Sequence, residues 1–175
     1  MRCACAGSSD VDSAMTPTTR GVLLTYAWVF LVGNLVWEVV QLPFYTLFRE
    51  ARPTDIAWAV LHCTVGDLLI GASVLGLSVV LVGARRWPQA HFGRVALAAI
   101  ALGVGYTVFS EWFNVTVRGS WTYAPAMPRL PPLGTGLAPL LQWLAVPSVA
   151  FALARRKALN ASCKRDGCRE DVPRG

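Results

Sequence analysis

The sequence contains few charged residues for its length. Charged side chains make up 15% of its 175 residues, and hydrophobic residues make up 54%. An average soluble domain carries about 25% charged residues, so this composition argues against a soluble globular protein. The net charge of +6 does not indicate nucleic-acid binding, because no basic stripe interleaved with aromatic residues is present.

Motifs of several enzyme classes are missing. The chain has no phosphate-binding loop, no dinucleotide fingerprint and no HExxH or GxSxG motif. It contains only 2 histidines, His62 and His91, so a histidine-rich haem or zinc site is not expected. No cofactor is evident from the sequence.

The 5 cysteines include no CxxC pair. Four of them lie near the chain ends, at Cys3, Cys5, Cys163 and Cys168, and no histidine accompanies them. We interpret them as reduced thiols on exposed chain ends. A terminal cluster that binds a soft metal is the alternative.

Four apolar segments are long enough to cross a bilayer as helices. They cover about residues 21–44, 56–83, 95–115 and 134–154. A hydrocarbon core about 30 Å thick needs about 20 helical residues, and the period-two alternation of barrel strands is absent. We therefore predict an all-α membrane protein, a four-transmembrane-helix bundle at residues 21–155. A disordered tail at 1–20, with Met15 as an alternative start, and a basic tail at 156–175 complete the chain.

The basic residues predict the orientation of this bundle. With four spans, both termini and the middle loop share one side of the membrane. The opposite side holds only Arg49, Arg52, Arg118 and Arg129 of the 16 basic residues. Cytoplasmic loops are enriched in Lys and Arg, so both termini are expected in the cytoplasm of a multi-pass protein of the bacterial inner membrane.

Polar residues inside the apolar segments are the main functional signal. Two triplets with spacings of four and three residues each occupy one helical face: Asn34, Glu38 and Gln41, and Thr107, Glu111 and Asn114. The second segment adds His62 and Asp67, and the fourth adds Gln142. At 1.5 Å rise per residue, these groups fall in the periplasmic half of the bilayer, whereas the cytoplasmic halves are almost purely apolar.

Carboxyl groups in a bilayer are expensive to keep, at roughly 2.5–3.5 kcal/mol for an Asp at a helix centre. We therefore predict a functional cavity into which Glu38, His62, Asp67 and Glu111 point as catalytic acid/base groups, or as ligands if a metal is bound. A second set is predicted to bind the ligand: Asn34, Gln41, Asn114, Trp121, Tyr123 and Gln142. Structural roles stay open, because carboxylates near an interface can pair with arginines and amides can join helices.

The loop before the last segment covers residues 118–136, and its four prolines and three glycines exclude a regular helix. Its Trp121, Tyr123, Met127 and Leu130 make it too apolar for a free loop. We expect it to fold back over the mouth of the bundle as a lid or re-entrant segment, or to serve as an interfacial anchor.

Several stretches resemble a family of small bacterial inner-membrane proteins that has no established activity. They are Trp-Glu-Val-Val-Gln-Leu-Pro-Phe-Tyr, His-Cys-Thr-Val-Gly-Asp, Glu-Trp-Phe-Asn-Val and Arg-Gly-Ser-Trp-Thr-Tyr. The resemblance covers about residues 22–150 and implies no catalytic residue. Glu111, Trp121, Tyr123 and Pro139 are also similar to a carboxylate, an aromatic loop and a Pro-flanked helix in membrane carotenoid cyclases and hydratases, although the paired-carboxylate motif of those enzymes is missing.

Three functions fit these features. The favoured one is an enzyme or binding protein for a lipophilic substrate that uses carboxylate acid/base chemistry. The second is a carrier of protons, metal ions or a small solute. The third is an accessory subunit that docks a membrane protein partner. Apart from the bilayer, a lipophilic small molecule is the expected partner.

Overall fold

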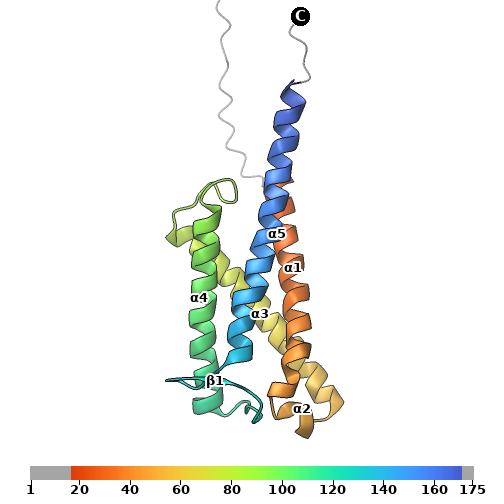
Figure 1. The fold of residues 1–175 in the computed structure, drawn as a ribbon, viewed down its shortest axis with the longest axis vertical. Helices are drawn as coiled ribbons and strands as arrows, with labels where there is room; N and C mark the ends of the chain where they lie inside the picture. Colours follow the sequence, from red (N-terminus) through yellow and green to blue (C-terminus); the bar gives the residue numbers. More distant parts are fainter. Residues whose placement is uncertain (1–16, 171–175) are drawn as a thin grey trace, which may run out of the picture.

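The computed structural model of the protein describes residues 17–170 (Figure 1). The predicted disorder of residues 1–16 and the thiols of Cys3 and Cys5 lie outside the described residues. The side chains of Cys163 and Cys168 are not described either.

Four long helices dominate the fold: α1 (Pro17–Gln41), α3 (Pro53–Leu81), α4 (Phe92–Trp112) and α5 (Leu137–Glu170). Each contains a stretch long and apolar enough to cross a membrane. The prediction of four helices with the length and composition of membrane spans is therefore confirmed, and the chain is compatible with an integral membrane protein.

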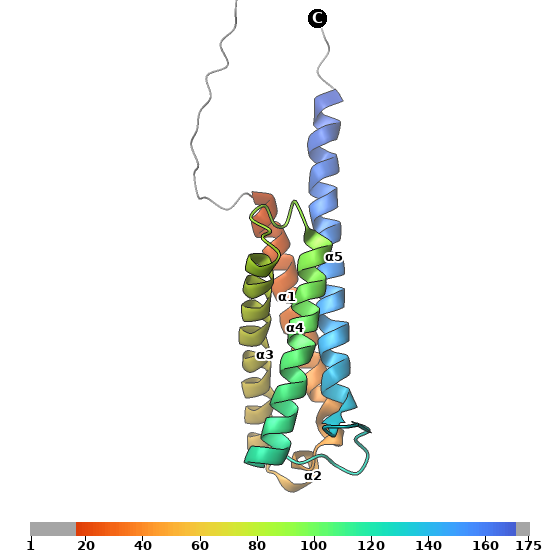
Figure 2. The same cartoon turned by 90° about the vertical axis from the view of Figure 1, so that its left-hand side faces the viewer.

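The helices pack as a ring in which α1 contacts α5 and α3, and α4 contacts α3 and α5. In Figure 1, α1 and α5 run side by side, while α3 crosses the bundle obliquely. Both described chain ends lie at one end of the bundle, together with the connection 82–91, as Figure 2 shows from the side. We call this the terminal end, and we call the opposite end, with the connections 42–52 and 113–136, the distal end.

The core is apolar toward the terminal end. Its buried members include Val22, Tyr26, Phe30, Val95 and Phe151. Glycines allow the helices to approach closely here, because a Cβ on Gly71 would lie 2.5 Å from the ring of Phe30. The distal half of the bundle holds the buried amides and carboxyls, so the uneven distribution of polar residues along the spans is present in three dimensions.

Most helix boundaries lie within about three residues of the sequence-based segments, and two extend further. α1 begins at Pro17 rather than near residue 21, and α5 continues to Glu170 rather than ending near residue 154. The apolar stretch that indicates a span measures the thickness of the hydrocarbon core. A helix can continue beyond it through residues such as Ala, Lys and Arg that favour helical backbone. α5 projects from the terminal end for this reason (Figure 2).

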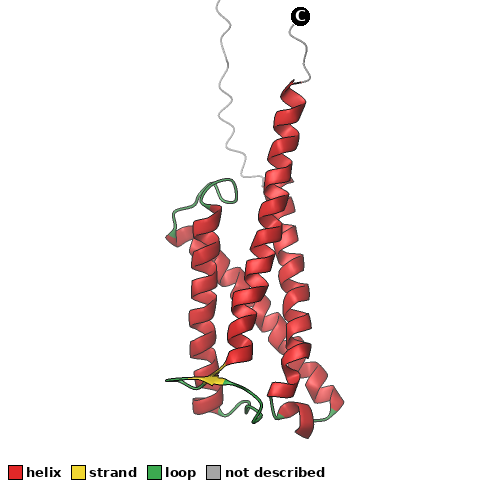
Figure 3. Cartoon of the chain, in the orientation of Figure 1, coloured by secondary structure: helices red, strands yellow, loops and turns green. Residues whose placement is uncertain are grey.

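The distal connections pack against each other. The first contains η1 (Leu42–Phe44) and α2 (Leu47–Glu50), and the second contains the π-helical η2 (Phe113–Arg118) and the short strands β1 (Arg129–Leu130) and β2 (Thr135–Gly136). β1 and β2 pair antiparallel across the distal end (Figure 3).

Backbone hydrogen bonds join these two connections. The N–H of Thr46 donates to the carbonyl of Thr122 at 3.0 Å, and the N–H of Ala124 donates to the carbonyl of Phe44 at 2.8 Å. Met127 of the second connection is buried in a small apolar cluster with Tyr123 and Ala138. The segment before α5 is therefore attached to the bundle rather than extended into the surroundings.

Candidate functional site

A single side-chain amide, that of Gln142 in the second turn of α5, connects α5 to polar groups of α1 and α3. Its Nε2 donates to Asn34 Oδ1 at 2.9 Å and to Glu38 Oε1 at 3.2 Å, both on α1. The same nitrogen donates to Asp67 Oδ2 of α3 at 2.8 Å. Its Oε1 accepts a hydrogen bond from Gln41 Nε2 at 3.1 Å. We call these five residues the Gln142 cluster.

The helical spacing explains how the cluster forms. Asn34, Glu38 and Gln41 lie on the face of α1 that packs against α5, and all of them are buried. A hydrogen bond of 3.2 Å from the indole Nε1 of Trp37 to the carbonyl of Ala138 fixes α1 and α5 at the same level. Gln142 is 2% exposed, so its amide depends on these partners rather than on solvent.

The cluster has more acceptors than donors. Gln142 Nε2 carries two hydrogens and faces three oxygen atoms. The Nδ2 of Asn34 donates to the carbonyl of Phe30 at 2.8 Å, within its own helix. The Oε1 of Gln41 is buried and has no hydrogen-bond partner. Buried polar atoms are nearly always paired, so this oxygen marks a place where a donor is missing.

No basic side chain compensates the carboxyl groups of the cluster. The only ion pair among the described residues is the exposed Arg52–Asp55 pair, at 2.9 Å. The alternative in which Glu38 or Glu111 pairs with Arg49, Arg52 or Arg118 has no ion pair to support it among the described residues. Two carboxyl groups thus share a nonpolar, cation-free environment.

A second pair lies beside the cluster, at the end of α4. The hydroxyl of Tyr123 donates to the carboxyl of Glu111 and accepts a hydrogen bond from the N–H of Gly136 at 2.9 Å. The guanidinium of Arg129 lies 5.2 Å from the centre of the Tyr123 ring. Burial raises the pKa of Tyr123 above its usual range, and the neighbouring Glu111 raises it further. The hydroxyl therefore keeps its proton at neutral pH and donates a hydrogen bond to the Glu111 carboxyl.

The carboxyl groups of the two sites are close enough to influence each other. Glu38 interacts electrostatically with Glu111, and the thiol of Cys63 is near Glu38, Asp67 and Glu111. The indole Nε1 of Trp121 is buried without a hydrogen-bond partner of standard geometry, although it lies near the Glu111 carboxyl. Together, the Gln142 cluster, Cys63 and the Glu111–Tyr123 pair form what we call the distal polar region.

His62 does not join this region, which corrects its predicted inward orientation. Its side chain is exposed and stacks on Trp58, with ring centres 6.2 Å apart. The reason is rotational: His62 and Asp67 are about 140° apart around a helix of 3.6 residues per turn, so both cannot face the interior. His62 therefore lies outside the distal polar region.

Asn114 is likewise used within its own helix. Its Nδ2 donates to the carbonyl of Ser110 at 2.9 Å, and its side chain is only half-buried. No group of three or more His, Cys, Asp or Glu side chains with the geometry of a metal site occurs in the part of the chain that the structure describes. The region instead offers carboxyl and amide oxygens, a phenol and a thiol.

Cys63 of the distal polar region and Tyr45, which borders it, are not among the predicted site residues. Cys63 precedes Asp67 by one helical turn, and this spacing is the signal that would have included it. Tyr45 lies against Tyr123, with ring centres 5.6 Å apart. Tyr45 follows the end of α1 in an irregular connection, where no periodicity indicates which way a side chain points.

No protein-family model, no curated protein and no solved structure matches this chain. A fold of packed helices hosts many functions, so inference about activity depends on the chemistry of the distal polar region.

Proposed function

We propose that the protein is an integral membrane enzyme or binding protein for a lipophilic substrate, with acid/base chemistry supplied by Glu38, Asp67 and Glu111. The observation that carries this proposal is the contact of the Glu38 and Asp67 carboxyls with one amide nitrogen, that of Gln142. Three ionisable groups in a nonpolar bundle are costly, and such groups in membrane spans commonly serve a functional site.

The carboxyl pair supports proton transfer. Two adjacent carboxylates without a cation repel each other strongly in a nonpolar interior, which favours one proton shared between Glu38 and Asp67. Such a pair contains one acid and one base at neutral pH. It can therefore donate a proton to one atom of a substrate and accept one from another.

The Glu111–Tyr123 pair has a separate role in the proposed site, also at the distal end of the bundle. The protonated phenol is a hydrogen-bond donor held by the Gly136 N–H, and the loop that carries it covers the end of α4. We assign Tyr123 and Trp121 to orientation of a polar group of the substrate and the loop to exclusion of water. In the orientation favoured by the basic residues, this region lies in the periplasmic half of the bacterial inner membrane.

A carrier of protons, metal ions or solutes is the second candidate, and the apolar terminal half argues against it. Among the described residues, Ser78 is buried there, and its hydroxyl bonds to the carbonyl of Val74 in its own helix at 2.6 Å. The core around it is formed by apolar residues. A transport path needs polar groups through the full thickness, whereas an accessory subunit needs no acid/base chemistry at all.

Amide substitutions test the proposal. Glu38→Gln, Asp67→Asn and Glu111→Gln keep the side-chain shape and remove the ionisable proton. We expect each to abolish complementation of a gene-deletion phenotype while the purified protein stays at least as heat-stable in detergent, because a buried charge is relieved. Asp55→Asn is the matched control, since Asp55 lies on the same helix as Asp67 in the exposed ion pair with Arg52.

Full complementation by all three amide variants at native expression level would remove the acid/base proposal and leave the accessory role. Loss of complementation accompanied by loss of folding in all three would assign the carboxyls to structure alone.

A further inference from the structure

We infer that the distal polar region receives an amphiphile with one apolar chain and a hydrogen-bond-donating head, a hydroxyl or an ammonium group. The chain would lie in a groove between α1 and α3, and the head would contact Glu38 and Asp67. This inference rests on the proposed function and specifies its substrate class and route of entry.

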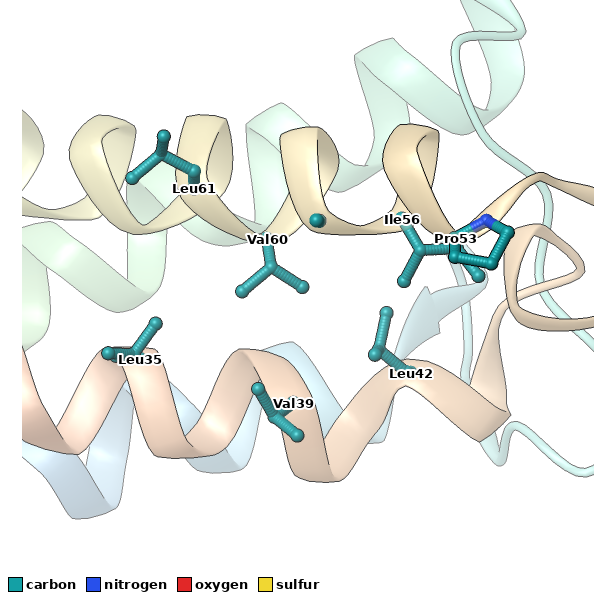
Figure 4. Close-up of a pocket in the computed structure, with 8 residues that line it drawn as sticks. Leu35, Val39, Leu42, Pro53, Ile56, Val60 and Leu61 are labelled. Carbon is teal, nitrogen blue, oxygen red and sulfur yellow. The ribbon is translucent and has the colours of Figure 1, made fainter.

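The groove has a volume of about 460 Å³, within the roughly 300–1,000 Å³ that small-molecule sites occupy. In Figure 4, Leu35 and Leu42 point toward α3, and Ile56 and Val60 point toward α1. The groove is lined by Leu35, Val39 and Leu42 of α1 with its following turn, and by Pro53, Ile56, Ala57, Val60 and Leu61 of α3.

Both walls of the groove continue into the Gln142 cluster. On α1, the groove residues Val39 and Leu42 directly follow the cluster residues Glu38 and Gln41 in the sequence, so the two sets occupy neighbouring faces of the helix. On α3, spacings of four, three and four residues from Ile56 lead to Asp67 by way of Val60 and Cys63, all on one helical face. Cys63 thus lies between the apolar wall and the carboxyl group.

The hydrogen-bond inventory defines the head group. The cluster lacks donors: three oxygens share the two hydrogens of Gln142 Nε2, and Gln41 Oε1 is buried without a partner. A hydroxyl or ammonium head supplies what is missing. A carboxylate or phosphate head would add acceptors and negative charge beside Glu38 and Asp67, and would be repelled.

The surroundings of the groove indicate that the rest of the ligand is an apolar chain. The groove opens on the outer surface of two apolar spans, where Val39 and Leu61 are 53% and 54% exposed. In a bilayer this surface faces acyl chains. An apolar helix from another protein would cover the groove but would supply no donor to Gln41 Oε1 or to the carboxyls of Glu38 and Asp67. The occupant that satisfies both halves of the site is therefore an amphiphile.

Photolabelling of the full-length protein in nanodiscs tests the inference. The probes are diazirine-bearing C16 chains with an alcohol, an amine, a methyl ether or a carboxylate head. We expect the alcohol or the amine to label peptides from α1 and α3 at least about tenfold more than the ether, the ratio expected from one hydrogen bond to a charged group. Glu38→Gln with Asp67→Asn should bring this ratio close to one.

Neighbouring valines on α1 provide the steric control. Val39→Trp fills the groove and should reduce labelling of α1 and α3 to the background of an empty nanodisc. Val40→Trp should leave it unchanged, because Val40 is 65% exposed and does not line the groove. Ala57→Leu fills the same groove with a smaller side chain and replaces Val39→Trp if that variant does not fold.

Equal labelling by the alcohol, amine and ether probes would overturn the head-group assignment. Undiminished labelling in both Val39→Trp and Ala57→Leu would overturn the groove. Either result combined with loss of complementation by the amide variants would remove this inference and leave the proposed function standing. Groove labelling with full complementation by those variants would support the binding site while removing the acid/base chemistry.

Discussion

Gln142 determines how the buried charges of this protein are tolerated. A primary amide offers donors and an acceptor on one planar group, so it can contact two carboxyls and still accept from Gln41. An arginine at this position would neutralise Glu38 and Asp67 and fix them as ionised groups. The amide leaves both able to gain or lose a proton, which is the property that the proposed chemistry requires.

Tyr123→Phe tests the second polar pair. The substitution removes the hydroxyl that bonds to the carboxyl of Glu111 and to the N–H of Gly136. We expect a loss of unfolding free energy of about 1–3 kcal/mol, the cost of a buried group without a hydrogen bond. Heat unfolding in detergent measures it. Tyr106→Phe is the control, because the Tyr106 side chain is 45% exposed on the outer face of α4.

The difference between wild type and Tyr123→Phe should also depend on pH. The pKa of Tyr123 is raised in the folded protein, so folding favours the neutral phenol. Its contribution is fully present below the pKa of an unfolded tyrosine, about 10, and declines as the pH rises above that value. Unfolding midpoints should therefore differ by a constant amount from pH 6 to 9 and converge above about 10. A difference that already declines near pH 7 would contradict the protonated-donor assignment.

At the residue scale, the sequence predicts which residues share a helical face better than it predicts their hydrogen-bond partners. The spacing of Asn34, Glu38 and Gln41 was sufficient to place them together, and Gln142 was identified as an interior polar residue. The spacing does not show which of two faces of α3 is interior, so His62 and Asp67 were treated alike although only Asp67 is near α1 and α5. Nor does it show that Asn114 bonds to its own helix, since a local carbonyl competes with any distant partner.

At the scale of the helix, a glycine is needed where another helix approaches its backbone closely, whatever its helix propensity. Gly103 of α4 is buried against the ring of Trp143, and an added Cβ would overlap that ring. Gly105, half a turn further along, has no atom of another residue within 4 Å of such a Cβ. Trp143 follows Gln142 in α5, so the approach of α4 at Gly103 also bears on the position of the cluster.

These two glycines form a matched pair for mutation. We expect Gly103→Ala to destabilise the protein by about 1–3 kcal/mol through overpacking. Gly105→Ala should stabilise it by up to about 1 kcal/mol, because alanine is the better helix former. Unfolding midpoints in detergent should therefore move in opposite directions. Equal shifts for the two variants would show that α4 and α5 are not in close contact at Gly103.

The sequence shows where spans occur but not where helices end or how loops attach. Apolar length and composition were sufficient to find all four spans, because a bilayer imposes a minimum length. The extension of α5 to Glu170 carries no apolar signal. The clustered prolines and glycines indicated an irregular segment before α5. Its attachment to the first distal connection through Thr46 and Thr122 depends on backbone groups, and these are identical in every residue.

At the scale of the whole molecule, the bundle is divided into an apolar terminal half and a polar distal half. The terminal half is a packed core that contains Phe30, Val95 and Phe151. The distal half carries the carboxyls, the covering connections and the groove. A site confined to one half of the bilayer suits chemistry on an amphiphile whose head lies near one membrane surface. It does not suit passage from one side to the other.

Topology therefore decides which compartment the site serves. The connection 82–91 at the terminal end carries Arg85 and Arg86, and the positive-inside rule predicts that it lies in the cytoplasm. Alkaline phosphatase, which is active only outside the cytoplasm, should be inactive when fused after Arg86 and active when fused after Arg52. The reverse pattern would move the distal polar region to the cytoplasmic leaflet. The hydrogen bonds of Gln142 would be unchanged, but the amphiphile would then have to be one that is present in that leaflet. The two fusions distinguish a periplasmic site from a cytoplasmic one without knowledge of the substrate.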